Sequence, residues 1–238
     1  MKKMTGKLRG LRTIFLFGSA MLLSACGGSG SSSDVTTAAP LVDVAPSGAS
    51  SINYNLWDLI DTLPYEFLDV AELDALGFMR EEEKLARDVY LFLYKLWGSQ
   101  IFSNIANSEQ THTDVVLRLI QKYDLADPAE GRLQGELSDP TLQGLYDTLV
   151  ALGTFSLIDA LLVGATIEDL DIYDLHRLMA FVDNQDITVV FENLLKGSRN
   201  HMRAFSARLA NLNLVYTPVY ISQEEYDAII DSPMEPGP

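Results

Sequence analysis

A glutamate and a histidine stand three residues apart near the middle of the chain, as Glu109 and His112. Apolar side chains recur at helical spacing from Phe102 to Tyr123, and both polar residues fall on the same helical face. Burying an unpaired charge costs on the order of several kcal/mol, so the carboxylate and the imidazole need partners from elsewhere in the chain. A Glu and a His three residues apart point at the same place, as ligands of a carboxylate-bridged metal pair do.

Three more apolar stripes carry polar residues in the same way. Glu168 and Asp171 interrupt one stripe, His201 interrupts another, and Glu82 and Glu83 open a third. Each of the four stripes therefore has an acid or a histidine on or beside its apolar face. Four amphipathic helices of this kind predict a bundle with a metal site in its core.

Each candidate ligand also has a simpler explanation. The Glu/His pair on the first stripe could be a buried salt bridge, and Asp171 could be a solvated member of the acidic run at 168–171. A lone histidine such as His201 is more often a core side chain than a ligand. Glu82 lies nearer the centre of its apolar arc than Glu83, so periodicity by itself favours Glu82.

The helices that would position these residues have recognisable ends. Long helices are expected at about 71–97, 99–123, 156–181 and 186–211. Gly98 marks the end of the first helix, and Ser156 is a plausible N-cap of the third. Because almost nothing separates the first two helices, they are expected to form a tight antiparallel hairpin.

A connection of about thirty residues follows the second long helix, and it contains two Asp-Pro steps and a short amphipathic helix at about 141–152. Such a length suits a crossover along the bundle, of the kind found in ferritin-like folds. The expected organisation is a signal peptide at 1–25, a flexible Gly/Ser/Ala tether at 26–50, an N-terminal extension at 51–70, an all-α four-helix domain at 71–212, and a C-terminal strap with a disordered tail at 213–238.

The formal charge of −16 includes a basic N-terminus. Residues 1–25 hold five Lys or Arg side chains and no acid, so their removal would leave 12 basic against 33 acidic side chains, a charge of −21. Binding to nucleic acid or to an anionic lipid surface depends largely on neutralising phosphate charge, so the acidic character of this chain argues against both as partners. Cations such as Fe²⁺ would be attracted.

The basic residues are followed by an apolar run that ends in Leu-Ser-Ala-Cys, with Cys26 the one cysteine of the chain. This pattern is typical of a signal peptide, and its ending resembles the bacterial lipobox. The resemblance implies that Cys26 becomes the lipidated first residue of a protein anchored in the cell envelope, facing the periplasm from the outer membrane in a Gram-negative cell. An ordinary secretory signal with a chance cysteine is the alternative.

Three segments resemble the rubrerythrin diiron domain. The run from Glu83 to Tyr90, Glu-Lys-Leu-Ala-Arg-Asp-Val-Tyr, is similar to its Glu-x-x-Ala-Arg-x-x-Tyr opening. The run from Ile101 to His112 resembles its second helix, and the run from His201 to Phe205 resembles the end of its fourth. Residues 72–212 as a whole most resemble a ferritin-like, rubrerythrin-related family of prokaryotic domains of unknown function.

The resemblance implies six metal ligands. They are Glu83, Glu109, His112, Glu168, Asp171 and His201. Three further residues are candidates for positions just outside the ligands, namely Glu82, Tyr90 and Ser198. Rubrerythrin carries a glutamate at the place of Ser198, and Asp171 could restore the number of carboxylates, although the site could instead be asymmetric or open.

Two functional hypotheses follow, with a third as the alternative to both. The first is a diiron oxidoreductase that oxidises Fe²⁺ with peroxide or dioxygen at the envelope, with Mn or Zn as alternative metals and a separate electron donor, because no second cysteine exists for a rubredoxin-type iron site. The second is a non-catalytic metal-binding module for storage, sensing or delivery. The third is a metal-free, lipid-anchored interaction domain, and for any of these a homodimer is an open alternative to a monomer.

Overall fold

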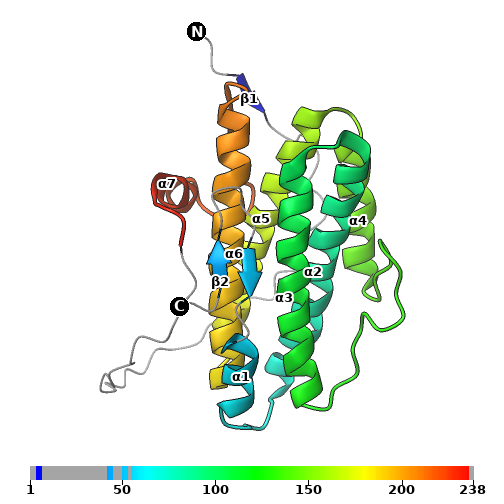
Figure 1. Cartoon of the computed structure of the whole chain (residues 1–238), viewed down its shortest axis with the longest axis vertical. Coiled ribbons are helices and arrows are strands. Elements are labelled where there is room, and N and C mark those ends of the chain that lie inside the picture. The colour runs from blue at the N-terminus through cyan, green and yellow to red at the C-terminus, as the bar shows by residue number, and fades with distance from the viewer. Residues whose placement is uncertain (1–3, 7–41, 45–49, 53–54, 236–238) are drawn as a thin grey trace, which may run out of the picture.

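The computed structural model describes residues 4–6, 42–44, 50–52 and 55–235, and most of these residues belong to helices (Figure 1). The elements in chain order are β1 (Met4–Gly6), β2 (Val42–Val44), β3 (Ser50–Ile52), α1 (Asn55–Thr62), α2 (Val70–Trp97), α3 (Gln100–Lys122), α4 (Pro140–Gly153), α5 (Leu157–Met179), α6 (Gln185–Ala210), β4 (Leu214–Tyr216) and α7 (Gln223–Asp231). The three-residue strands pair only as β1 with β4 and β2 with β3. The described part of the chain is therefore an all-α protein of seven helices.

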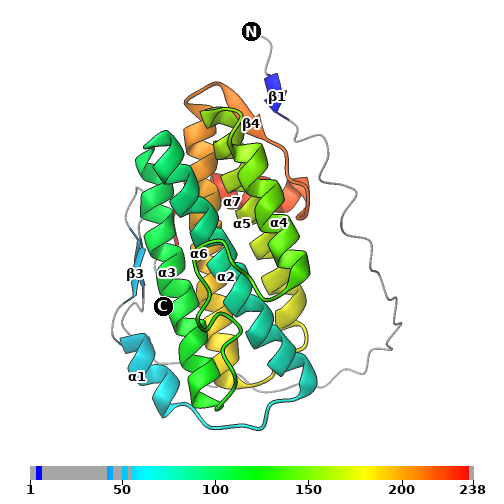
Figure 2. The same cartoon turned by 90° about the vertical axis from the view of Figure 1, so that its right-hand side faces the viewer.

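Four long helices, α2, α3, α5 and α6, run lengthwise beside one another. The helices α2 and α3 pack as one hairpin, and α5 and α6 pack as another. Contacts of α3 with α6 and of α2 with α5 join the hairpins into a bundle, and α4 lies outside it against α2 and α5 (Figure 2). The connection between α3 and α5 thus carries the short helix that the sequence predicts.

The helix ends follow from local sequence. Asp69 caps α2 by accepting a hydrogen bond from the Glu72 backbone N–H, and the Glu72 carboxylate accepts one from the Asp69 N–H in return. Gly98 ends α2 with φ of 64°, a left-handed conformation that glycine adopts at little cost. The Ser156 hydroxyl caps α5 at the Asp159 N–H, as the sequence predicts.

A layer of aromatic rings fills the bundle core on one side of the polar residues. Tyr90, Phe102 and Phe205 are fully buried, and the ring centroid of Phe205 lies 5.5 Å from that of Tyr90 and 6.0 Å from that of Phe102. Gly164 on α5 leaves the space that the Phe205 ring occupies. The hydroxyl of Tyr90 extends from this layer and donates a hydrogen bond to the carboxylate of Glu168. Apolar packing therefore borders the candidate ligands directly.

The segment after α6 packs back on the bundle, and it contains a helix that the sequence analysis did not foresee. The sequence predicts a strap across the bundle, whereas residues 223–231 form α7, which Ser222 caps by accepting from the Glu225 N–H. Tyr226 and Ile229 of α7 are buried. The amphipathic pattern of α7 is only nine residues long, which is too short to stand out from a strap by periodicity.

Beyond α7, ion pairs and a hydrogen bond hold the chain against α6. The Glu235 carboxylate pairs with Arg199 and with Arg203, at 2.7 and 2.6 Å from the guanidinium nitrogens of these two side chains. The side chain of Asn200 donates to the Glu235 backbone carbonyl at 2.8 Å. Glu235 lies within the segment for which the sequence predicts disorder, yet these contacts fix it to α6. Residues 236–238 lie outside the described residues.

One buried carboxylate holds the C-terminal segment to the bundle. Asp169 on α5 is fully buried and accepts a hydrogen bond from the Tyr216 hydroxyl at 2.7 Å. It also accepts from the three consecutive backbone N–H groups of residues 219–221, at 2.5 to 3.1 Å. A carboxylate with four donors is satisfied even though it is buried.

Replacing Asp169 with alanine is expected to lower the free energy of unfolding by about 3 kcal/mol, because the backbone N–H groups at 219–221 would be left without an acceptor. Urea unfolding measures this change. Glu192→Ala, at an exposed position on α6, is the matched control and should change stability by less than about 0.5 kcal/mol. Equal stability of the two variants would show that Asp169 does not anchor the segment.

Several predictions from the sequence concern the N-terminus. Of the predicted signal peptide, residues 4–6 are described, as β1. Cys26 and most of the predicted tether, residues 26–41 and 45–49, lie outside the described residues. The predicted short helix near Trp57 is present as α1. Among the helices of the described part, none combines the length and the apolar character that a membrane span requires.

Candidate metal centre

The four long helices bring five of the six candidate ligands into two groups in the bundle core. The first group is Glu83, Glu109 and His112, and the second is Glu109, Glu168 and His201. All five residues are buried, and in each group one potential ligand atom per residue lies within 4.8 Å of the others. Glu109 belongs to both groups, so the two triads are adjacent and share a carboxylate.

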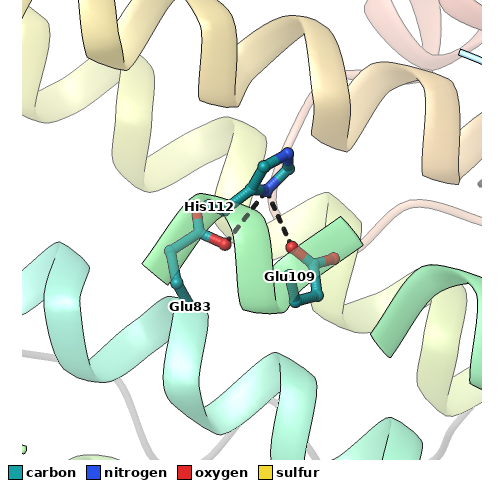
Figure 3. A group of neighbouring side chains, drawn as sticks. All are labelled: Glu83, Glu109 and His112. Atoms are coloured by element: carbon teal, nitrogen blue, oxygen red, sulfur yellow. Dashed lines mark hydrogen bonds and ion pairs between the residues drawn. The ribbon is translucent and has the colours of Figure 1, made fainter. Parts of the chain in front are cut away.

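In the first triad, two carboxylates from different helices approach one imidazole nitrogen (Figure 3). The Nδ1 atom of His112 lies 2.8 Å from Oε2 of Glu109, one turn earlier on α3. The same Nδ1 lies 3.2 Å from Oε2 of Glu83 on α2. The other oxygen of Glu83 is buried and has no hydrogen-bond partner among the described residues. This triad therefore contains a carboxylate oxygen that is available to bind a metal ion.

The second triad is built from three helices around His201 of α6. Its Nδ1 atom lies 2.9 Å from Oε1 of Glu109 and 3.4 Å from Oε2 of Glu168 on α5. Despite these short distances, His201 Nδ1 makes no hydrogen bond of acceptable geometry within the described part of the chain. The three atoms therefore lie close together while Nδ1 is left unsatisfied, an arrangement that suits ligands of a metal ion.

Two residues that the sequence analysis did not single out position the imidazoles. The Oγ atom of Ser108 lies 2.8 Å from Nε2 of His201. The ring of His112 lies against Gly197 of α6, at a place where any Cβ atom would overlap Nε2 and Cε1 of the ring. Both histidines thus present Nδ1 to the carboxylates while their Nε2 atoms face the protein, and the rings stack 5.5 Å apart.

Burial and neighbouring charges have opposing effects on the pKa values of these groups. Burial opposes ionisation of Glu109, yet His201 and His112 hold the pKa of Glu109 well below its usual value. Burial raises the pKa of Glu83 to about 8 and that of Glu168 to about 6. Burial disfavours charge on His201, but Glu109 and Glu168 raise its pKa to about 9. In the absence of metal, protons therefore supply the counter-charge for the buried carboxylates.

The donor set fits two divalent ions. Each triad offers one imidazole nitrogen and two carboxylates, which suits iron, manganese or zinc. A metal ion in each triad would replace protons as the counter-charge and would engage the unpartnered Glu83 oxygen and His201 nitrogen. The two triads could thus bind two metal ions, with Glu109 between them.

Asp171, the sixth candidate ligand, belongs to neither triad. Its Oδ2 atom accepts a hydrogen bond from the hydroxyl of Ser198 on α6, while its Oδ1 atom is buried and has no hydrogen-bond partner in the described part of the chain. Burial, together with the charges of Glu83 and Glu168, raises the pKa of Asp171 well above its usual value. Ligation by Asp171 stays a prediction.

The two adjacent glutamates of α2 have different neighbours in the structure. Glu83 contacts His112, whereas Glu82 belongs to neither triad and lies near Asp174 of α5. Periodicity alone favoured Glu82, because the apolar arc of α2 is wide and fixes the core direction poorly. Tyr90 borders the second triad through its hydrogen bond to Glu168.

Comparisons with known proteins agree with this fold. A family model described as an uncharacterized protein domain (DUF2202) matches residues 72–233. The uncharacterized protein MJ0754 of Methanocaldococcus jannaschii is 54% identical over 180 residues, which are 76% of this chain and 97% of the relative. The crystal structure of hypothetical protein MJ0754 from the same organism matches with a TM-score of 0.72 at 55% identity and covers 73% of this chain and 99% of that chain. The helical domain of this chain therefore belongs to the DUF2202 family.

Proposed function

We propose that the chain is a ferritin-like, rubrerythrin-related protein that binds two iron ions and oxidises Fe²⁺ with peroxide or dioxygen. The observation that carries the proposal is the pair of buried Glu/His triads that share Glu109. The bundle with a helix-bearing connection between α3 and α5 supports it, as does the order of the motifs along the chain.

Two ferrous ions would supply one electron each, enough with two protons to reduce one molecule of hydrogen peroxide to two waters. Two-metal sites hold their ions about 3.5–4 Å apart, and a carboxylate that serves both triads suits that spacing. Glu109, with one oxygen near each histidine, would occupy the bridging position.

The surrounding residues keep the site dry and hold its side chains in place. The triad residues are at most 4% exposed, so bulk water is excluded. Burial raises the pKa of Tyr90 well above its usual value, so its hydroxyl keeps its proton and donates to Glu168. Ser108 fixes the far nitrogen of His201, which leaves Nδ1 directed at Glu109.

We further propose that this activity takes place at a cell envelope, with the protein anchored through lipid on Cys26. The leader pattern that ends at Cys26 supports the location. With a single cysteine, the sequence offers no Cys-bound rubredoxin iron, so electrons would come from a separate donor. The acidic net charge of the chain is consistent with attraction of Fe²⁺.

An anaerobic titration of the chain with Fe²⁺, followed by peroxide or air, tests the proposal. We expect two irons per chain, rapid consumption of the oxidant, and near-ultraviolet absorption from a ferric pair. His176→Ala is a suitable control, because His176 is on the surface of α5 beside Glu225 and should leave iron binding unchanged. Failure to bind iron, zinc or manganese would contradict the proposal and favour a metal-free interaction domain.

A non-catalytic metal-binding module is the second candidate function. Ser198 favours it, because a hydroxyl stands where rubrerythrin has a carboxylate, and this hydroxyl is engaged with Asp171. Such a module would bind two ions without consuming peroxide or oxygen when Fe²⁺ is added. The oxidant measurement in the same titration separates the two functions.

A further inference from the structure

Large apolar side chains are exposed at the end of the bundle where α2 begins. Phe67 is 94% exposed, the highest fraction among the large hydrophobic side chains of the described residues, and Phe181 is 64% exposed. Tyr65, Val70 and Leu73 are exposed as well. We call these five residues the apolar end patch. Exposed apolar side chains that gather within a polar rim mark surfaces on which another molecule docks.

Two connections between helices meet in the apolar end patch. The connection between α1 and α2 carries Tyr65 and Phe67, and the connection between α5 and α6 carries Phe181. Both connections lie at the same end of the bundle in Figures 1 and 2. The Glu72 carboxylate joins them, because it accepts from the backbone N–H groups of residues 183 and 184 at 3.2 and 3.0 Å. Residues far apart in the chain are thus held on one surface.

Acidic side chains without an ion-pair partner surround the apolar end patch. Asp69, Asp74 and Asp183 are exposed, and each lies within two residues of a member of the patch. None of the three forms an ion pair within the described part of the chain. Basic side chains near this end are already paired with other acids, and they are Arg118, Lys122 and Arg177. The negative charge around the patch therefore suits a partner with a positive rim.

We propose that the apolar end patch docks a small basic redox protein, whose own docking face carries apolar side chains inside a ring of lysines or arginines, and that this partner donates electrons to the metal centre. The donor role rests on the proposed function, whereas docking does not. Reduction of one hydrogen peroxide takes up two electrons and two protons and gives two waters. Two one-electron donor molecules are therefore oxidised for each peroxide.

Helix α2 connects the apolar end patch directly to the centre. Leu73 of the patch and Glu83 of the first triad are both on α2, and ten residues of helix span about 15 Å. The other end of α2, at Trp97, is fourteen residues from Glu83, or about 21 Å. Along α2, a donor docked on the patch would therefore be closer to the centre than one docked at the opposite end.

The charge around the patch disfavours two other occupants. A second copy of this chain would bring a second set of unpaired aspartates against the first, and like charges across an interface oppose association. An anionic lipid surface meets the same repulsion. A basic protein satisfies both features of the surface, because its apolar side chains cover the patch and its rim pairs with the acids.

Calorimetric titration of the metal-free full chain with cytochrome c at low ionic strength tests docking. Cytochrome c is a suitable probe because it is basic and has lysines around its exposed haem edge. We expect one cytochrome c per chain, and an affinity about tenfold weaker when Phe67→Ser and Phe181→Ser are combined, since exposed aromatic anchors dominate such interfaces. The two changes leave the net charge of the chain unaltered.

Phe155→Ser is the matched control. Phe155 is 76% exposed and lies at the other end of the bundle, near the contact in which Trp97 donates to the Gly153 carbonyl at 2.9 Å. This variant should bind cytochrome c as the parent chain does. Absence of saturable binding by the parent chain, or equal affinities of Phe155→Ser and of the folded double variant, would overturn the docking proposal. Thermal unfolding checks that each variant is folded.

The acidic rim has a separate test. Asp183→Asn should slow association with cytochrome c and reduce its salt dependence more than Asp147→Asn does, because Asp147 is exposed on α4 away from the patch. Both variants remove one negative charge from the chain. Equal association rates of the two would overturn the role of the rim, because net charge alone would then attract the probe.

Two further measurements identify a different occupant. A dimer of the parent chain in sedimentation, dissolved by the double serine change, would overturn the proposal in favour of a second copy. Binding to phosphatidylcholine vesicles that the same change abolishes would overturn it in favour of a lipid surface. Neither loss is expected for the parent chain with a protein partner.

Oxidation of ferrocytochrome c by peroxide in the presence of the iron-loaded chain tests the donor role. We expect two cytochromes oxidised per peroxide, and a rate about tenfold lower for the double serine variant at subsaturating cytochrome c. Docking without such oxidation would overturn the donor role. Iron binding and oxidant consumption without docking would overturn the patch proposal alone, so its failure is distinguishable from failure of the proposed function.

Discussion

Replacing Glu109 with glutamine is expected to remove both metal ions at once. The two oxygens of Glu109 lie 2.8 and 2.9 Å from the Nδ1 atoms of His112 and His201, so one side chain serves both triads. Glutamine keeps the shape but lacks the second anionic oxygen that a bridging ligand needs. Metal analysis of the loaded chain should therefore fall from two ions to none.

Thermal unfolding gives an independent measure of the same change. A ligand that binds only the folded chain stabilises it by about 4 kcal/mol at a concentration of 1,000 times Kd, per site. The parent chain should therefore melt at a markedly higher temperature when Fe²⁺ or Mn²⁺ is added under anaerobic conditions. The Glu109→Gln variant should gain nothing from the metal, because neither triad remains complete.

Single histidine variants provide the comparison. His112→Ala should lose the ion of the first triad, and His201→Ala the ion of the second, because each histidine belongs to one triad only. Glu81→Gln, a buried change on α2 away from both triads, should keep both ions. Two ions retained in Glu109→Gln would contradict the shared-carboxylate arrangement.

Gly197→Ala is expected to weaken metal binding at the first triad by about 10–100-fold without altering any ligand. The added Cβ would overlap the ring of His112, so the imidazole must move away from Glu83 and Glu109. Changes in residues that orient metal-binding histidines have effects of this size. The ion count of the second triad should be unaffected, since His112 is not one of its residues.

Gly197→Ala also distinguishes the cost of overpacking the core from the gain in helix propensity. Alanine in place of glycine in a helix interior stabilises by about 1 kcal/mol, whereas overpacking a core costs about 1–3 kcal/mol. Gly77 in α2 has open space around it, so Gly77→Ala should gain helix stability and leave metal binding unchanged. Gly197→Ala should instead lower the free energy of unfolding. If Gly197→Ala bound metal as tightly as Gly77→Ala, the ring of His112 would not be fixed by Gly197.

The sequence determined the helices and the approximate composition of the centre. The helical spacing of apolar side chains predicts the four long helices to within about two residues of their observed ends. Gly98 and Ser156 mark two of these ends. The Glu-x-x-His spacing of Glu109 and His112 is local, because it needs only one turn of helix to bring the two side chains together. The resemblance to rubrerythrin supplied the partners from the other helices. These features depend on residues close in the chain or on a known pattern.

The tertiary structure decided which residues meet. Periodicity could not separate Glu82 from Glu83. Only the packing of α2 against α3 and α5 assigns Glu83 to His112 and Glu82 to Asp174. The contact between Gly197 and His112 joins positions 85 residues apart, and no local pattern encodes it. A helical pattern in the sequence gives the direction in which each side chain leaves its helix only to within a broad arc. The rotation and register of four packed helices decide which of those side chains share a point in space, and that depends on the whole core at once.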